Sequence, residues 1–206
     1  MNYRAINGRI AINPSEHFLE SDRINHQETY DLLEKIGFEL IENDILKLAR
    51  SCIVLSSVVR GVDDTHAPAI VNEATFVRWV YANLGIRLPP RCMQLFEIGE
   101  VVYVDEHKAG DLVFFRGTQP QYVNDPEKGV GHVGVLTGED SYIHVRYQDP
   151  AGVVEESINQ EQLEVSRGVR RILFEETLTL SIPDNIYLEE SVGLQWVIEK
   201  HLQELL

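Results

Sequence analysis

Two histidines near the middle of the chain have the chemistry and the spacing to act together. His132 begins the apolar run 133–136, and His144 follows twelve residues after His132, beyond a turn at 138–141. If the two segments form adjacent antiparallel strands, the imidazoles lie within reach of each other. One imidazole can then act as a general base while a second polar group holds it in orientation, as the activation of a thiol nucleophile requires. The sequence therefore predicts a base and its orienting partner, and the nucleophile has to come from another element.

The composition indicates one globular domain. The chain has 206 residues, 44% of them hydrophobic, which is enough for a full core. No run approaches the roughly 20 apolar residues that cross a bilayer, and the first residues lack the pattern of a signal peptide. Two cysteines, Cys52 and Cys92, are too few for a disulfide framework or a thiolate metal site. We therefore expect a reducing, cytoplasmic location.

The formal net charge of −15 is spread along the chain. Nucleic acids and anionic membranes repel such a surface, so neither is an expected partner. No acidic run singles out a cationic partner, and we expect the charge to serve solubility.

The apolar periodicity changes along the chain from helical to strand-like. Helical spacing begins at Asn25 and recurs over 44–56 with Asn43 as the cap, over 73–84 with Asn72 as the cap, and over 188–205. Strand-like runs lie at 101–104, 112–115, 132–136, 142–145, 153–156 and 169–174, with a short helix at 159–165. Helices first and strands second indicate an α+β fold with an antiparallel sheet.

The predicted domain organisation has three parts. Residues 1–42 form an N-terminal arm, irregular over its first 24 residues, with one helix. Residues 43–176 form the main domain, and 177–206 form a helical extension packed on that same domain, with Trp196 in its core contact. The polar insertion 119–131 is expected near the mouth of a cleft.

Three motifs in this order carry a resemblance to a known family: GIRLPPR at 85–91, AGDLVFF at 109–115, and GHVGVLTG followed by YIH at 131–144. Together they resemble the NlpC/P60 family of cysteine peptidases, over roughly residues 45–174. The resemblance implies a papain-like α+β fold, in which N-terminal helices pack on an antiparallel sheet of about five or six strands. Members of this family typically cleave peptide bonds in bacterial cell-wall peptides.

The same resemblance assigns roles within the site. His132 corresponds to the family's base and His144 to the group that orients it. The family's nucleophilic cysteine begins the helix before the GIxLP turn, and here Glu73 stands in that place. A carboxylate that attacked an amide would form a less stable anhydride, so we expect Glu73 to stay ionised beside an imidazolium. The resemblance thus implies a pseudoenzyme that binds peptides or regulates. The residues expected to contribute to binding are Asn72, Thr75, Arg91, Cys92 and Gly131.

Two other interpretations stay open. An active peptidase or amidase could use Cys92, or a water molecule activated by Glu73 and His132. Cys52 lies on the apolar face of the 44–56 helix and is expected to be buried, whereas Cys92 follows Leu-Pro-Pro-Arg, where we expect no helix N-terminus to activate it. In the other interpretation, a structural or assembly protein has its cleft filled by side chains.

Metal and cofactor chemistry is not expected. Glu73, His132 and His144 are metal-binding residue types, but an orienting imidazole lies behind the base, whereas metal ligands converge on one point. The expected partners are a peptide or muropeptide ligand and either an active relative or a second copy of this chain.

Overall fold

The computed structural model describes residues 2–18, 25–42, 44–117, 119–123, 129–138 and 140–204. The chain divides into two compact units, one made of 1–43, 81–87 and 175–206, and the other of 44–80 and 88–174. The predicted boundaries lie at 42/43 and 176/177. The two units meet at 43/44 and 174/175, within two residues of these predictions. The prediction of two separate additions to one domain was wrong, however, because the terminal segments fold with each other.

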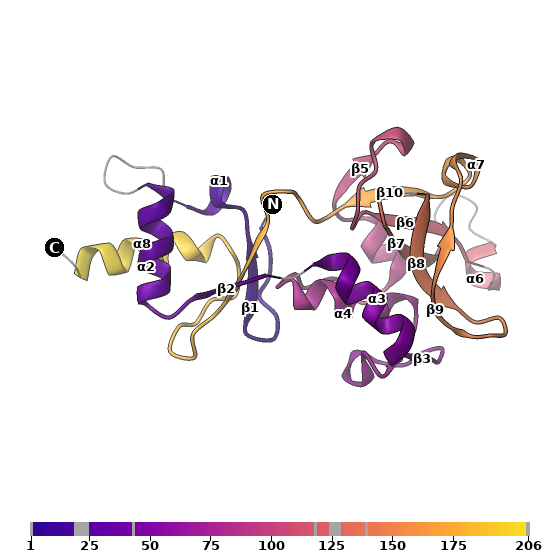
Figure 1. Cartoon of the computed structure of the whole chain (residues 1–206), viewed down its shortest axis with the longest axis horizontal. Coiled ribbons are helices and arrows are strands. Elements are labelled where there is room, and N and C mark those ends of the chain that lie inside the picture. Colours follow the sequence, from indigo (N-terminus) through magenta and orange to yellow (C-terminus); the bar gives the residue numbers. More distant parts are fainter. Residues whose placement is uncertain are drawn as a thin grey trace. The chain divides into compact units, whose positions relative to one another are not determined.

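The first unit is built around a small antiparallel sheet. Its elements are β1 (Arg9–Ile12), α1 (Pro14–His17), α2 (His26–Lys35), β2 (Glu39–Ile41), β11 (Leu178–Ser181) and α8 (Gly193–Glu204), with the strands in the order β1-β11-β2. Ile10, Ile12 and Leu180 are buried in its core, and α2 packs against α8 (Figure 1). The described part of the N-terminal arm is therefore not irregular. Local sequence did not reveal β1, because the partner that β1 pairs with begins at Leu178.

The last helix begins later than predicted, and the face that it buries does not include Trp196. It begins at Gly193, five residues after the predicted start, and buries Leu194, Val197 and Ile198. Those residues follow the i, i+3, i+4 spacing of one helix face, and Trp196 lies on another face. Trp196 is 64% exposed, so its expected role in core packing was wrong.

The second unit carries an antiparallel sheet of six strands in the order β5-β10-β6-β7-β8-β9. These strands are β5 (Glu100–Val102), β6 (Leu112–Arg116), β7 (Val130–Leu136), β8 (Ser141–Arg146), β9 (Gly152–Ser157) and β10 (Gly168–Arg171). All six overlap with predicted runs, although β5 ends two residues before its predicted end at 104 and β10 three residues before its predicted end at 174. The predicted α+β class, with an antiparallel sheet, is confirmed.

Helices and short strands complete this unit, except that residues 81–83 at the end of α4 belong to the first unit. They are α3 (Ile45–Leu55), β3 (Ser57–Val58), η1 (Asp64–His66), β4 (Ile70–Val71), α4 (Glu73–Asn83), α5 (Cys92–Phe96), η2 (Val104–Glu106), α6 (Pro120–Val123) and α7 (Gln160–Glu164). In the sheet region, α3 packs against β9 (Figure 1), and α5 packs against β7. The side chain that caps α3 is Asp44, one residue after the predicted cap Asn43, which lies outside the described residues. No helix among the described residues is long and apolar enough to cross a membrane.

A buried ion pair joins two neighbouring strands of the large sheet. The carboxylate of Asp111, which precedes β6, accepts hydrogen bonds from Arg171 Nε and Nη2 at 2.9 and 2.7 Å. Asp111 also accepts from the backbone N–H of Lys108 at 2.8 Å. Because Asp111 is only 2% exposed, these contacts satisfy a charge that would otherwise be costly to bury. They hold the start of β6 against the end of β10.

Candidate functional site

A cavity of about 820 Å³ opens in the second unit. Its wall includes the start of α4, the start of α5, strands β7 and β8, and the residues after β8. The described part of the insertion contributes Gln119, Tyr122, Val130 and Gly131. This agrees with the expectation that the insertion lies at the cleft mouth, although residues 124–128 lie outside the described part of the chain.

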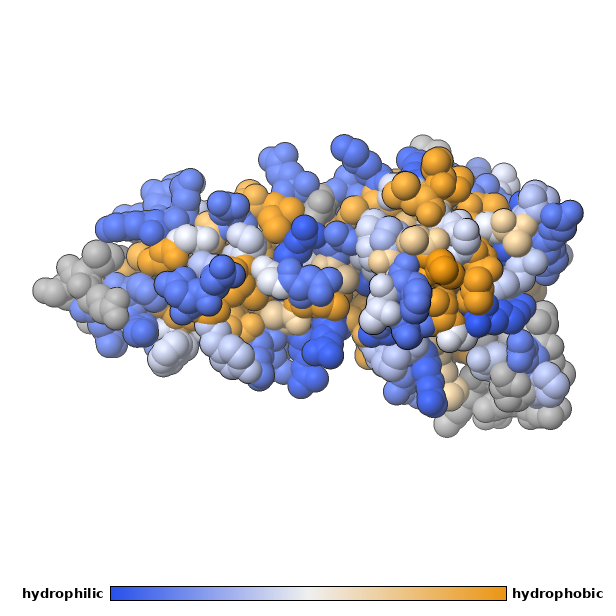
Figure 2. Space-filling model, turned by 90° about the horizontal axis from the view of Figure 1, so that it is seen from below, coloured by the Kyte–Doolittle hydropathy of each residue, from blue (hydrophilic) through white to orange (hydrophobic). Residues whose placement is uncertain are grey.

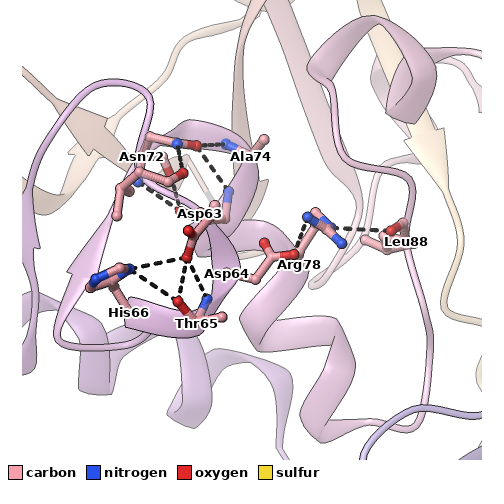
Figure 3. A network of polar contacts seen from close by, with 10 residues as sticks. Asp63, Asp64, Thr65, His66, Asn72, Ala74, Arg78 and Leu88 are labelled. Atoms are coloured by element: carbon pink, nitrogen blue, oxygen red, sulfur yellow. Dashed lines mark hydrogen bonds and ion pairs between the residues drawn. The ribbon is translucent and has the colours of Figure 1, made fainter.

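The start of α4 is held by a polar network around Asn72 (Figure 3). The Oδ1 atom of Asn72 accepts hydrogen bonds from the backbone N–H groups of Ala74 and Thr75, both at 3.0 Å, and therefore caps the helix as predicted. Its Nδ2 donates to the carbonyl of Val62 at 2.7 Å. Farther along α4, Arg78 pairs with Asp64 and donates to the carbonyl of Leu88. These contacts fix the first turn that carries Glu73.

Thr75 was predicted to contribute to binding, and the structure places it elsewhere. It is 4% exposed and does not line the cavity. Its Oγ1 accepts a hydrogen bond from the backbone N–H of Asn72 at 2.8 Å, so it belongs to the helix cap. The other four predicted binding residues, Asn72, Arg91, Cys92 and Gly131, do line the cavity.

The two histidines meet as the sequence predicts. His132 Nε2 lies 2.9 Å from His144 Nδ1, and His144 Nε2 lies 3.1 Å from a carboxylate oxygen of Glu156 on β9. Since the carboxylate can only accept, His144 Nε2 donates to it and His144 Nδ1 accepts from His132 Nε2. Arg146 donates to the other oxygen of Glu156 at 2.7 Å. The Nδ1 atom of His132 is thereby turned towards Glu73.

The strand register shows how the imidazoles come together. His144 pairs with Gly134, so His132 lies two residues along β7 and reaches His144 diagonally. A Cβ atom at Gly134 would lie 2.6 Å from the ring of Tyr142 and 3.1 Å from Cβ of His144. Tyr142 stacks on His144 with 4.3 Å between the ring centroids. The absence of a side chain at Gly134 thus gives both rings their space.

The pKa values of His144 and Glu156 are both lower than usual, for different reasons. Burial, together with the positive charge of His132, lowers the pKa of His144, while Glu156 opposes this shift. Burial alone would raise the pKa of Glu156, but hydrogen bonds from His144 and Arg146 bring it below the usual value. The pair is therefore set up as a neutral imidazole that donates to an ionised carboxylate.

Glu73 faces this chain from the start of α4. One oxygen accepts a hydrogen bond from the Tyr147 hydroxyl at 2.7 Å, and the other lies 3.9 Å from His132 Nδ1, an ion-pair distance. Burial alone would raise the pKa of Glu73, but His132 and the Tyr147 hydroxyl lower it below the usual value. The carboxylate is therefore ionised at neutral pH, as expected for a group that pairs with an imidazolium.

Cys92 is the first residue of α5, where no helix was predicted. The expectation that it lies away from a helix N-terminus was therefore wrong; the helix has five residues, too few for a recognisable periodic pattern. Burial and the negative charge of Glu73 raise the pKa of Cys92 to about 12. The group is a thiol at neutral pH and lacks the thiolate that attacks carbonyl groups. Cys52 is fully buried, as predicted, and burial raises its pKa as well.

Three contributors to the site were missed from the sequence. Tyr147 follows the last residue of β8, so the alternation of strand residues does not extend to it. Arg60 lies in the loop after β3, where its guanidinium stacks 3.7 Å from the centroid of the Tyr147 ring. Glu156 reaches His144 only through the β8–β9 register, in which Glu156 pairs with Tyr142. Strand pairing brings Glu156 to His144, and contacts between distant segments bring Tyr147 and Arg60 to Glu73.

Residues 70–167 match the family model of the NlpC/P60 family, which covers the cavity-lining α4, α5, β7 and β8. This cavity-forming segment is therefore similar to the NlpC/P60 family, as its motifs indicated.

Similar proteins include enzymes of the bacterial cell wall. Over 73 residues the chain is 36% identical to the peptidoglycan DL-endopeptidase CwlO of Bacillus licheniformis, which corresponds to 34% of this chain and 14% of that protein. Among solved structures, NlpC1 and NlpC2 of Trichomonas vaginalis each have a TM-score of 0.50 at 18% identity. These matches cover 62% and 64% of this chain, and 42% and 47% of the respective relatives. The chain thus spans less than half of each of these three relatives.

Proposed function

We propose that this chain is a catalytically inactive NlpC/P60 protein that binds a peptide in its cleft. The observation that carries the proposal is Glu73, an ionised carboxylate at the start of α4 that faces the oriented His132. In the family resemblance this place belongs to the nucleophilic cysteine. Glu73 presents the negative charge of a thiolate to the imidazole without its nucleophilicity towards an amide.

The described groups around Glu73 offer no substitute for a thiolate. The thiol of Cys92 is protonated at neutral pH because its pKa is about 12. The low pKa of Glu73 makes it a weak base for activating water, since catalytic efficiency requires a pKa near the working pH. Both observations argue against the alternative of an active peptidase or amidase.

The size of the cavity supports binding. A volume of about 820 Å³ falls within the range of about 300–1,000 Å³ that ligand sites commonly have. The interpretation as a structural protein requires the cleft to be filled by side chains, and an open cavity of this size disfavours it. A peptide from the bacterial cell wall is the proposed ligand because the curated relative is a peptidoglycan endopeptidase.

A paired assay tests this proposal. The parent protein and its Glu73→Cys variant are incubated with muropeptides and γ-D-glutamyl dipeptides, and the products are separated by chromatography. We expect saturable binding without turnover in the parent and hydrolysis in the variant, because the His132–His144 pair is already oriented. Glu73→Ala is the matched control, since it removes the carboxylate without supplying a thiol. Hydrolysis by the parent would overturn the proposal of inactivity, and failure of the parent to bind either peptide would overturn the proposal of binding.

The remaining expectations stay predictions. Both cysteines are free, which fits the predicted cytoplasmic location, and cell fractionation would test it. Pairing with an active relative or with a second copy would appear in analytical ultracentrifugation of the purified protein.

A further inference from the structure

A group of exposed apolar side chains lies at the end of α3 and just after β3, outside the cavity. Its members are Ile53, Val54, Leu55 and Val59, with exposed fractions of 39, 88, 57 and 50%. None of the four lines the cavity. Single exposed apolar residues are ordinary on protein surfaces, whereas a group of large ones marks a site of interaction. Together these four residues form the α3 patch.

The helical spacing of α3 explains why Val54 points to solvent. The buried residues of this helix follow the three- and four-residue spacing of one face, and they are Ile45, Ala49 and Cys52. The helix packs against β9 in the second unit (Figure 1). At 100° per residue, Lys47, Arg50 and Val54 fall on the opposite face, and all three are exposed. Val54 therefore shares its exposed face with two basic side chains.

The segment that carries the α3 patch is basic, although the chain as a whole is acidic. Residues 45–60 contain three basic residues and no acidic one, whereas the chain has 33 acidic residues and a formal charge of −15. Of the three, Arg60 belongs to the cavity wall, and Arg50 donates hydrogen bonds to Glu155 on β9 at 2.9 and 3.0 Å. The side chain of Lys47 forms no hydrogen bond or ion pair with any other described residue. Lys47 is thus a cation that a ligand on the patch can reach.

The acidic residues nearest in sequence do not cancel this charge, because other side chains engage them. The contacts are those of Asp63 with Thr65 and His66, and of Asp64 with Arg78. The surface around Lys47 and Val54 therefore suits a ligand that is both apolar and negatively charged.

The size of the α3 patch decides which kind of partner it fits. Four partly exposed aliphatic side chains present apolar surface on the order of a few hundred Å². Two folded proteins in a stable complex each bury roughly 800 Å², so the patch is too small to hold a second copy of this chain by itself. An anionic membrane is disfavoured by the net charge of −15. A short segment of another protein matches the available area.

We infer that the α3 patch binds a short acidic segment of a partner protein. Apolar side chains of that segment cover Val54 and its neighbours, and a carboxylate of the segment pairs with Lys47. This binding is separate from the cleft and does not depend on the function proposed for the cleft. At physiological salt the Debye length is about 8 Å, so a bound carboxylate responds to the adjacent cation more than to the net charge of the chain. Apolar contact then supplies the affinity, and the cation selects the sign of the ligand's charge.

Nuclear magnetic resonance titration of the full chain with a matched pair of probes tests the inference. One probe is a synthetic peptide of about 14 residues, with leucine on one helix face and glutamate on the other. The second probe has lysine in place of every glutamate. At about 150 mM sodium chloride, we expect the glutamate peptide to shift the backbone amide signals of residues 47–60 and to leave those of β7 in the cavity wall unchanged. The lysine peptide should leave the signals of residues 47–60 in place.

Variants assign the binding to the patch and to its cation. Val54→Ser should weaken binding of the glutamate peptide about fivefold or more, because it removes the most exposed apolar side chain of the patch. Lys47→Gln should weaken it about twofold to fivefold, as expected for an exposed ion pair. The matched control is Val165→Ser, which removes a valine that is 78% exposed at the end of α7, and it should leave the affinity unchanged. Thermal unfolding of all three variants should match that of the parent, since each replaces an exposed side chain.

Several results would overturn the inference. Equal affinity of the parent and Val54→Ser, or amide shifts confined to the cavity wall, would show that the patch does not bind the peptide. Tighter binding of the lysine peptide at residues 47–60 would refute the selection of an acidic ligand. If the parent but not Val54→Ser sedimented with phosphatidylserine vesicles, the patch would be a membrane contact instead. A dimer in analytical ultracentrifugation that Val54→Ser abolishes would replace the partner segment by a second copy of the chain.

Discussion

At the scale of single residues, the centre of the site is an imidazole that faces a carboxylate. His144 and Glu156 orient His132, and one oxygen of Glu73 lies 3.9 Å from its Nδ1 atom. The Tyr147 hydroxyl donates to the other oxygen of Glu73 at 2.7 Å and fixes the position of the carboxylate. Glu73 is thus held between a hydroxyl and an imidazole.

The low pKa of Glu73 makes part of the stability depend on pH. Because the pKa is lower in the folded protein than in the unfolded chain, the contribution is present above the unfolded value of about 4.3 and is lost as the pH falls through the folded value. We expect the parent's advantage in free energy of unfolding over Glu73→Gln to shrink as the pH falls from about 7 to about 3. Urea unfolding at several pH values measures it, and a constant difference would contradict the expectation.

The charge of Glu73 should also control the reactivity of Cys92. Glu73 is the second cause of the raised pKa of Cys92, after burial. In Glu73→Gln we therefore expect the pKa of the thiol to fall while staying above its ordinary value, since burial persists. The pH dependence of alkylation by iodoacetamide measures this pKa. A Cys52→Ala background limits the reaction to Cys92, and identical pH profiles with and without Glu73 would refute the coupling.

At the scale of elements, β7 and β8 place the histidines by their register. The pairing of Gly134 with His144 leaves room for the imidazole and for Tyr142, whose ring stacks on it. The pairing of β8 with β9 brings Glu156 within 3.1 Å of His144. A slip of one residue in either pairing would turn the side chains to the other face of the sheet.

Two glycines of the same sheet offer a matched test of this packing. In Gly134→Ala the new methyl group would lie 2.6 Å from the Tyr142 ring, so we expect a loss of about 1–3 kcal/mol in free energy of unfolding. Gly152 on β9 has no atom within 4 Å of such a methyl group. Gly152→Ala should therefore be neutral or stabilise by up to about 1 kcal/mol. Chemical denaturation compares the two, and equal effects would show that space at Gly134 is unimportant.

At the scale of the whole molecule, the dominant feature is a net negative charge. Hydrophilic residues cover much of the face seen in Figure 2, between smaller hydrophobic areas. A charge of −15 repels itself in the compact state, and added salt screens that repulsion. The exposed ion pairs, such as Arg4 with Glu190, weaken with salt too, but each contributes only about 0–1 kcal/mol.

We therefore expect the melting temperature to rise by a few degrees when sodium chloride increases from about 20 to about 300 mM. Differential scanning calorimetry measures the change. Sodium sulfate at equal ionic strength is the control, because sulfate also strengthens the burial of apolar groups. A melting temperature that falls with sodium chloride would mean that favourable ion pairs outweigh the net repulsion.

The sequence by itself determined the features that depend on local patterns of residues. The six strands of the large sheet, α4 with its cap at Asn72, and the pairing of His132 with His144 all follow from periodicity, turn residues and spacing. The match of residues 70–167 to the family model could be predicted from the order of the motifs. These features depend on neighbours a few residues apart, which the sequence presents directly.

Only the tertiary structure decided which distant segments meet. It joined β1 to β11 in one unit, brought Glu156 behind His144, and placed Tyr147 and Arg60 against Glu73. It also showed that Cys92 lies at a helix start but remains a protonated thiol, because burial and a nearby carboxylate outweigh that position. Each of these outcomes depends on strand register, burial or charge between residues far apart in the chain, and local sequence carries no record of those distances.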